Sequence, residues 1–222
     1  MNAEEYNRLL GERREARETA NPELRLRREQ VEREREERVA RSRAEQEPLL
    51  ADLRAVGCIA QGVYDLVNYR GSYPEAIPVL LKHVQRVPPY SETILTGLIR
   101  ALTVKEGKGV FNKIALRMFR EDTHEPSANG VRWCLANALT VVAGIDDVDE
   151  MIAFVTNVGH AGSRTPLVDA LARFLGRRPD IVEVLESLCD DPFIKKRVQI
   201  VLSRKSVEKA REELKRTRGL SS

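Results

Sequence analysis

Four stretches of the chain align without gaps: ILTGLIRAL (94–102), VRWCLANAL (131–139), SRTPLVDAL (163–171) and IKKRVQIVL (194–202). Their first residues are 37, 32 and 31 positions apart. In all four, the fifth and ninth positions are Leu or Val, and the eighth position is Ala or Val. Residues three or four apart share one face of an α-helix, so each stretch predicts a helix with one apolar side.

A second apolar helix is predicted before each stretch, because apolar residues recur there at the same helical spacing. These segments are residues 76–87, 110–120, 148–158 and 180–189. The unit is therefore a pair of antiparallel helices that repeats along the chain. A lone pair cannot bury its apolar face, whereas stacked pairs can, which favours a row of repeats with neighbour-only contacts. A compact helical bundle is the alternative, but it gives no reason for the nine-residue match.

The repeats resemble the HEAT family. VRWCLANAL is similar to the second-helix pattern of that family, with Val-Arg followed by Ala-Leu, and AIPVLLKHV (76–84) is similar to its first helix. The resemblance covers roughly residues 50–205 and implies an all-α fold, a right-handed α-solenoid of about four to five HEAT-like helix pairs. Two stretches depart from the pattern: one contains Pro166, which we expect in the first turn of its helix, and IKKRVQIVL lacks the Ala-Leu pair.

Composition divides the chain into three parts. Residues 1–47 hold 12 Arg and 13 Glu and predict a charged helical arm, with a stop and restart at Asn21-Pro22 and a boundary at Pro48. Residues 48–205 are the repeat domain, whose first helices near residues 50–69 form an imperfect pair. Residues 206–222 are a basic C-terminal helix and tail, and residues 195–222 together carry 10 basic and 3 acidic side chains.

Three separated cysteines, Cys58, Cys134 and Cys189, form no disulfide framework and fit a reducing compartment. The first 30 residues are too charged for a signal peptide, and no apolar run reaches the length that a membrane-spanning helix needs. We therefore expect a cytoplasmic protein that does not bind a membrane.

The third and seventh residues of each nine-residue stretch, and the residue that directly follows the stretch, lie opposite its leucine face. In HEAT-like solenoids the second helices line the concave surface, so the resemblance implies that this row is displayed there. Its members are mostly small or polar: Thr96, Arg100, Thr103, Trp133, Asn137, Thr140, Thr165, Asp169, Ala172, Lys196, Ile200 and Ser203.

Trp133 is the single tryptophan of the chain, and it stands on this row beside Arg132. Tryptophan and arginine are enriched in the hot spots of protein interfaces. This favours a partner protein bound by Trp133, Arg132, Asn137, Arg100, Thr165, Asp169 and Lys196. The alternative is that Trp133 packs against a neighbouring repeat or the arm.

Basic residues recur on the second helices and in the tail, and they suggest a nucleic-acid surface made by Arg164, Arg173, Arg197, Arg204 and Lys205. Two other interpretations stay open. The arginines can pair with acidic residues of the neighbouring repeat, such as Asp169, and the tail can be a solvated capping helix with interleaved glutamates.

No catalytic motif is present, and we expect no cofactor and no metal site. His83, His124 and His160 have no second ligand at metal-binding spacing. The acidic group Asp146, Asp147, Asp149 and Glu150 suits the start of a helix near Val148 better than a cation site.

Three functions follow from these patterns. The first is a non-enzymatic scaffold that binds another protein, whose identity the sequence does not give. The second is a nucleic-acid-binding protein. Alkylpurine DNA glycosylases have a similar HEAT-like fold with tryptophans and an aspartate in the groove, but here Asn137 stands four residues after Trp133. The third, by analogy of fold with HEAT-like bilin lyases, is a lyase or chaperone.

Overall fold

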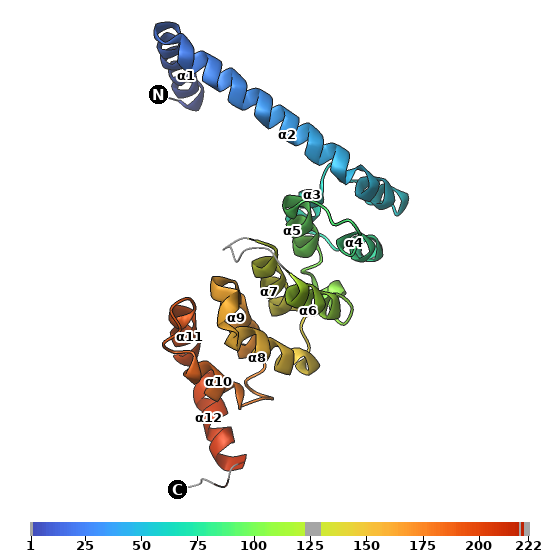
Figure 1. Ribbon diagram of the computed structural model, residues 1–222, viewed down its shortest axis with the longest axis vertical. Coiled ribbons are helices and arrows are strands. Elements are labelled where there is room, and N and C mark those ends of the chain that lie inside the picture. Colours follow the sequence, from blue (N-terminus) through green and yellow to red (C-terminus); the bar gives the residue numbers. More distant parts are fainter. Residues whose placement is uncertain (1, 123–129, 218, 220–222) are drawn as a thin grey trace. The chain divides into compact units, whose positions relative to one another are not determined.

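The computed structural model describes residues 2–122, 130–217 and 219, and over these residues the chain is all-α, without a strand. It divides into two compact units, Met1–Glu47 and Pro48–Ser222 (Figure 1). His124 and Arg218 lie outside the described residues. Every helix over the described ranges is too short or too polar to cross a lipid bilayer.

The first unit consists of α1 (Ala3–Ala20) and most of α2 (Pro22–Ala55). The predicted stop and restart is confirmed: Asn21 Oδ1 accepts a hydrogen bond from the Glu23 amide at 3.1 Å, and Pro22 is the first residue of α2. The described side chains of this unit are mostly exposed, so its helices rely on local helix propensity and on pairs such as Arg25 and Glu29 (3.5 Å).

The two units divide between Glu47 and Pro48, where the sequence predicts a domain boundary. Helix α2, which the sequence predicts to end at residue 47, instead continues to Ala55. A proline inside a helix costs about 3 kcal/mol, because it removes one hydrogen bond and crowds the preceding turn. Leu49, Leu50 and Leu53 in the following turns are buried, and each buried leucine contributes about 1.5–3 kcal/mol. Burial of these leucines therefore outweighs the proline.

The second unit begins with the end of α2, and its described residues form ten further helices, connected in places by short 3₁₀ turns. They are α3 (Val63–Asn68), α4 (Ile77–Val84), α5 (Glu92–Ala101), α6 (Phe111–Glu121), α7 (Val131–Val142), α8 (Val148–Thr156), α9 (Thr165–Ala172), α10 (Ile181–Ser187), α11 (Lys195–Leu202) and α12 (Lys205–Thr217). The eight predicted helices of the four repeats are present as α4 to α11. Pro166 lies in the first turn of α9, as expected.

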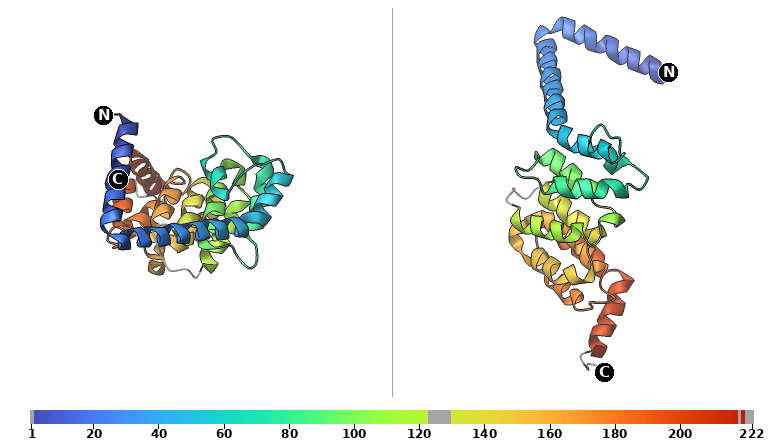
Figure 2. Two further views of the ribbon diagram at one scale, coloured as in Figure 1. Left: turned by 90° about the horizontal axis from the view of Figure 1, so that it is seen from above. Right: turned by 90° about the vertical axis from the view of Figure 1, so that its right-hand side faces the viewer.

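The helices of the second unit pack in pairs, and the pairs follow one another in chain order. Helix α4 packs on α5, α6 on α7, α8 on α9, and α10 on α11. The second helices also contact each other in sequence, α5 with α7, α7 with α9, and α9 with α11. The same order is visible from other directions in Figure 2. The four matching stretches thus lie side by side in order.

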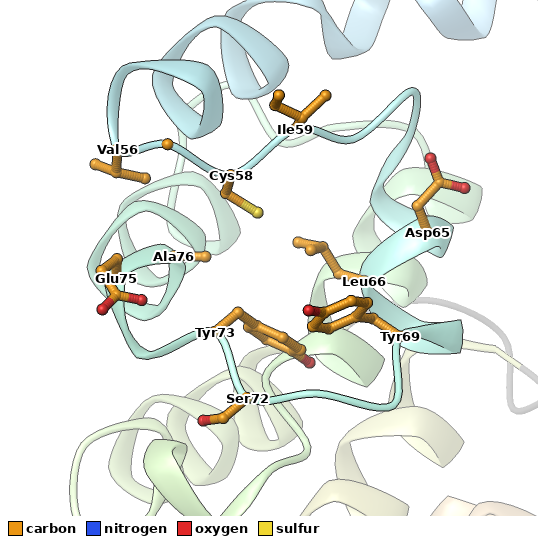
Figure 3. A pocket seen from close by; sticks show the side chains of 11 residues that line it. Val56, Cys58, Ile59, Asp65, Leu66, Tyr69, Ser72, Tyr73, Glu75 and Ala76 are labelled. Carbon is orange, nitrogen blue, oxygen red and sulfur yellow. The ribbon is translucent and has the colours of Figure 1, made fainter.

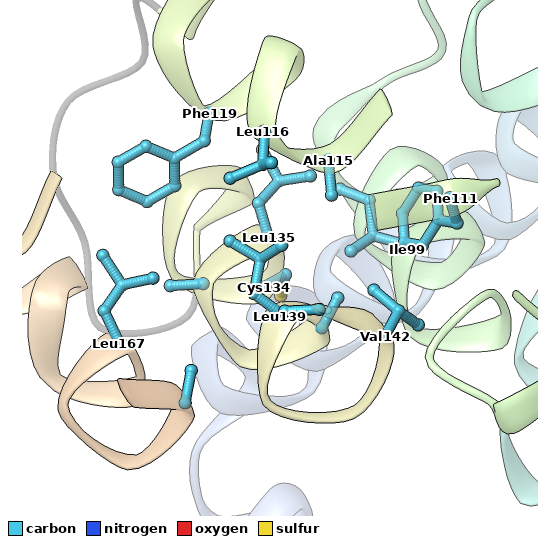
Figure 4. Close-up of a cluster of buried hydrophobic side chains, with 14 of the residues drawn as sticks. Ile99, Phe111, Ala115, Leu116, Phe119, Cys134, Leu135, Leu139, Val142 and Leu167 are labelled. Atoms are coloured by element: carbon cyan, nitrogen blue, oxygen red, sulfur yellow. The ribbon is translucent and has the colours of Figure 1, made fainter. Parts of the chain in front are cut away.

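The leucine face of each stretch forms the core. The fifth, eighth and ninth residues are fully buried in the first three repeats, and in the fourth Val198 and Val201 are fully buried while Leu202 is half-buried. Figure 4 shows how Leu135 and Leu139 of α7 lie between α6 residues such as Leu116 and the neighbouring Leu167 of α9. Each helix pair therefore completes its apolar environment with the next pair.

Asp147 replaces the expected helix cap with a link between repeats. Its carboxylate accepts hydrogen bonds from the Gly144 amide (2.8 Å), from Asn112 Nδ2 (2.7 Å) and from Lys113 Nζ (2.7 Å). Asn112 and Lys113 belong to α6, whereas Asp147 precedes α8. Burial alone would raise the pKa of Asp147, but these hydrogen bonds outweigh it and hold the pKa below its usual value. Asp147 therefore connects one repeat to the next, while Asp149 and Glu150 lie in the first turn of α8, where the sequence predicts acidic residues.

Gly97 sets the distance between α5 and α3. A Cβ atom at Gly97 would lie 2.4 Å from Val63 Cγ1 and 3.2 Å from Tyr64 Cε2. We predict that Gly97→Ala lowers the free energy of unfolding by about 1–3 kcal/mol, because it overpacks this contact. Urea denaturation measures the change. Gly176→Ala is the control, since a Cβ there meets nothing within 4 Å. Equal stability of the two variants would contradict the close contact.

Candidate functional site

The polar row opposite the leucine faces is the candidate interaction surface, and we call it the second-helix row. Its predicted partner-binding members Arg100, Trp133, Asn137, Thr165 and Asp169 are all half-buried, and Lys196 is exposed. Because these residues come from α5, α7, α9 and α11, which contact each other in order, the row extends across all four repeats. It presents polar groups, one indole ring, the exposed Ile200 and one exposed lysine.

Trp133 has features of both interpretations made from the sequence, the partner-binding residue and the packing residue. Its side chain packs against the hydrophobic core, yet it is only partly covered and keeps part of its surface accessible. An indole held on one side by the protein is a rigid apolar surface, which costs little entropy to use in binding. Trp133 is therefore the aromatic member of the row, and Ile200, which is 51% exposed, is its other large apolar member.

Arg132 lies away from the row. Its side chain is 11% exposed, and its Nε is 3.3 Å from Asp122 Oδ2 at the end of α6. The guanidinium also lies 6.0 Å from the ring centre of Phe119. The Arg132 side chain is thus already engaged between α6 and α7, which leaves less of it for the predicted partner.

The first member of the row is covered. Thr96 is buried, its hydroxyl donates to the Thr93 carbonyl at 3.0 Å, and it lies 3.3 Å from the Tyr64 hydroxyl. Tyr64 belongs to α3, which lies in the imperfect pair predicted near residues 50–69 and precedes the four matching repeats. Thr96 is therefore not displayed, and the exposed part of the row begins at Arg100.

Most of the arginines predicted to bind nucleic acid instead connect neighbouring repeats. Arg197 of α11 donates from Nε and Nη2 to the carboxylate of Asp169 of α9, with both distances 2.6 Å, and Arg204 Nη2 approaches the same carboxylate at 3.3 Å. Arg173 donates to the carbonyl oxygens of Leu139, at 3.4 Å, and Thr140 on α7. The interpretation that arginines pair with acidic residues such as Asp169 is thus confirmed for Arg197.

Arg100, on α5 of the first matching repeat, makes a similar connection. A hydrogen bond to Cys134 of α7 raises the pKa of the Arg100 guanidinium. Links made by arginines therefore join α5 to α7, α7 to the end of α9, and α9 to α11. Paired guanidinium groups fix the spacing of the helices, and they have fewer free donors for phosphate.

Arg164 is fully buried, so its predicted role in nucleic-acid binding is wrong. Its Nε donates to the Ala161 carbonyl (2.9 Å), Nη1 to the Val155 carbonyl (2.9 Å) and Nη2 to Asp191 Oδ2 (2.7 Å). Burial would raise the pKa of Asp191, but the hydrogen bond from Arg164 and the amides of Phe193 and Ile194 hold it below the usual value. The pair connects η4 (Val158–Arg164) to the loop before α11.

A group of exposed lysines lies at the C-terminal end. Lys195, Lys196, Lys205, Lys209 and Lys215 are exposed, and within the described part of the chain none of them forms an ion pair. The same end displays Phe193, which is 59% exposed, and Ile200, which is 51% exposed. Glu186 pairs with Arg211 and Glu213 with Arg216. Lys205 is thus the predicted nucleic-acid residue that remains unpaired.

The described histidines serve packing. His83, which is buried, lies 2.9 Å from Asp52 of α2 through Nε2 and 2.7 Å from the Tyr90 hydroxyl through Nδ1. His160 packs edge-on against Phe119 and Phe154, and burial, followed by the charge of Arg132, lowers its pKa. Over the described ranges, no three His, Cys, Asp or Glu side chains gather closely enough to hold a metal ion.

Comparison of the chain with protein-family models, with curated proteins and with solved structures finds no match. The geometry of the second-helix row and the charges at the C-terminal end therefore carry the functional argument.

Arg164→Met should lower the free energy of unfolding at neutral pH by about 3–5 kcal/mol, because it leaves the Asp191 carboxylate buried without its cation. Asp191 is ionised and stabilising above its unfolded pKa, and this contribution is lost as the pH falls through its lowered folded pKa. The difference from wild type in urea titrations should therefore shrink in acid. Arg177→Met, at an exposed position, is the control. If Arg164→Met has the same free energy of unfolding as wild type at neutral pH, the buried pair of Arg164 and Asp191 does not stabilise the packing of the repeats.

Proposed function

We propose that residues 48–217 form a HEAT-like α-solenoid that acts as a protein-interaction module, with the second-helix row as its binding surface. The order of contacts among α5, α7, α9 and α11 supports this proposal, because it is the arrangement that stacked HEAT-like pairs produce. In such a stack the second helices line the concave side. The absence of a recognisable catalytic motif in the sequence agrees with a binding role.

The observation that carries the proposal is the half-buried Trp133 among polar residues of two neighbouring repeats. Asn137 lies one helical turn further along α7, and Thr165 and Asp169 lie on the adjacent α9, which packs on α7. An aromatic anchor surrounded by hydrogen-bonding groups is the usual composition of an interface centre. A bound segment that crosses α7 and α9 would cover the exposed part of the indole.

Trp133→Ala should reduce capture of the partner at least tenfold, since a hot-spot side chain contributes about 2 kcal/mol or more. The measurement is quantitative mass spectrometry of proteins retained by the immobilised full chain. Asn137→Ala should reduce the same captured species. Val158→Ala, at a side chain 70% exposed on η4, is the matched control and should retain it.

Thermal unfolding separates binding from folding in this comparison. Trp133 is only partly covered, so Trp133→Ala should keep a cooperative transition. If the captured species are the same for wild type, Trp133→Ala and Asn137→Ala, the second-helix row is not the binding surface.

A second candidate function, nucleic-acid binding, is favoured by the exposed lysines at the C-terminal end. Residues 195–222 carry a net charge of +7, and Phe193 offers an exposed ring on which a base can stack. The buried or paired state of Arg164, Arg173 and Arg197 removes much of the earlier argument for a basic groove. We therefore place this candidate on α11 and α12 and propose no base chemistry.

Changing Lys195, Lys196, Lys205, Lys209 and Lys215 to Gln should abolish any affinity for random-sequence DNA or RNA, measured by fluorescence anisotropy. Wild-type affinity should fall steeply with salt, with a logarithmic slope of about −0.9 for each phosphate contacted in duplex DNA. Lys105→Gln/Lys108→Gln, two exposed lysines outside this end, should bind as wild type. Salt-independent binding, or binding that survives the fivefold substitution, would exclude this surface.

A further inference from the structure

A cavity of about 270 Å³ lies at the N-terminal end of the second unit, apart from the second-helix row. The residues after α2, the helix α3 and the turn η1 (Pro74–Ala76) enclose it (Figure 3). Sites for drug-sized ligands usually measure about 300–1,000 Å³, so this cavity suits a small group. Sequence patterns did not indicate it, because its walls come mainly from loops.

Two tyrosines form one wall. The ring centres of Tyr69 and Tyr73 are 6.3 Å apart, and their planes are inclined by 50°. Tyr73 is buried, and its hydroxyl donates to the Ala101 carbonyl at 2.8 Å, which fixes the ring. Figure 3 shows both rings beside the space into which the Cys58 and Leu66 side chains point.

Gly71 makes room for the second ring. A Cβ atom at Gly71 would lie 2.6 Å from Tyr69 Cε1, closer than such atoms approach in proteins. The ring of Tyr69 therefore occupies the space that a side chain at residue 71 would need. Because Tyr69 is 60% exposed, the rest of the core does not fix its position, and the glycine is what permits this placement.

The charged side chains that line the cavity are both acidic, Asp65 and Glu75. A third carboxylate lies just behind the wall, since Ser72 Oγ donates to Glu106 Oε1 at 2.6 Å. This hydrogen bond holds the pKa of Glu106 below its usual value, so the carboxylate is ionised at neutral pH. Lys105 is a cation near Glu106, but it is not among the lining residues.

The thiol and phenol in the wall stay neutral. Burial raises the pKa of Cys58, and the negative charge of Glu75 raises it further. Burial likewise raises the pKa of Tyr73, with Glu106 as an additional cause. The negative charge of Glu75 thus acts on Cys58, and that of Glu106 acts on Tyr73, so the cavity wall is electronegative.

We propose that this cavity binds an organic ammonium group, either a small quaternary amine of the choline type or a methylated lysine side chain of another protein. The ring faces attract a cation through their quadrupoles, and the methyl groups bury apolar surface against Leu66 and the rings. The carboxylates add attraction for positive charge and repel anions. A neutral ligand of the same shape gains the apolar contact alone.

The test is a ¹⁵N NMR titration of the full chain with three probes: choline, a short Gly-Ser peptide with one trimethyl-lysine, and the uncharged choline analogue 3,3-dimethyl-1-butanol. Saturable shifts around residues 58–76 with choline or the peptide support the proposal, and the tighter of the two identifies the source of the cation. Equal binding of the uncharged alcohol, or no shift with either cation up to tens of millimolar, overturns it.

Variants locate the site. Tyr69→Leu keeps the apolar bulk but removes the ring face and should weaken binding of the cation by roughly threefold to thirtyfold. Gly71→Ala should weaken binding of the cation similarly, because the added Cβ displaces the Tyr69 ring. Glu75→Gln should weaken binding because it removes a negative charge. Tyr69→Phe keeps the ring and should bind the cation as wild type does.

Tyr6→Leu is the matched control, because Tyr6 is a comparably exposed tyrosine of α1. The melting temperature of each variant checks that the fold persists. Binding by Tyr69→Leu that equals binding by Tyr6→Leu would refute the site. The result is independent of the second-helix row, since no variant of this set lies on it.

Discussion

Burial of the leucine faces between consecutive second helices is the constraint on which the rest of the second unit depends. A helix such as α7 places Leu135 and Leu139 on one side, and both α6 and α9 pack against this helix. The apolar surface is removed from water only when the pairs stack, and this is the main favourable term in folding. The polar row on the opposite side follows from the same geometry, because a helix that buries one stripe displays the other.

Polar contacts between the pairs add specificity to this nonspecific attraction. Asp147 joins its loop to α6, Arg197 joins α11 to Asp169 on α9, and Arg164 joins η4 to Asp191. Each of these groups would be costly if buried without its partner, so they favour one register of the stack over neighbouring ones. Arginines that suggest a binding surface in the sequence are consequently occupied with the spacing of the helices.

The sequence predicts the helices of this chain well, since the three-and-four spacing of apolar residues specifies both helices of each repeat and their inner faces. It predicts the site less well. Burial of Arg164 depends on Asp191, 27 residues away, and no local pattern announces that pairing. Thr96 is covered by Tyr64 of α3, a helix that precedes the four matching repeats. Helix α2 continues past Pro48 because three leucines beyond the proline are buried. The tyrosine cavity escapes detection since loop conformation, and not periodicity, brings Tyr69 over Gly71.

The connection of each pair only to its neighbours also determines how the molecule opens. Helix α7 is held by α6 and by second helices on both sides, whereas α11 has a second helix on one side only, and Leu202 there is half-buried. Amide protons at the C-terminal end can therefore exchange with solvent through local fraying that leaves α5 to α9 intact. The exposed lysines and Phe193 are carried by this least protected segment, so a ligand that binds there would slow exchange locally before it raised the stability of the whole unit.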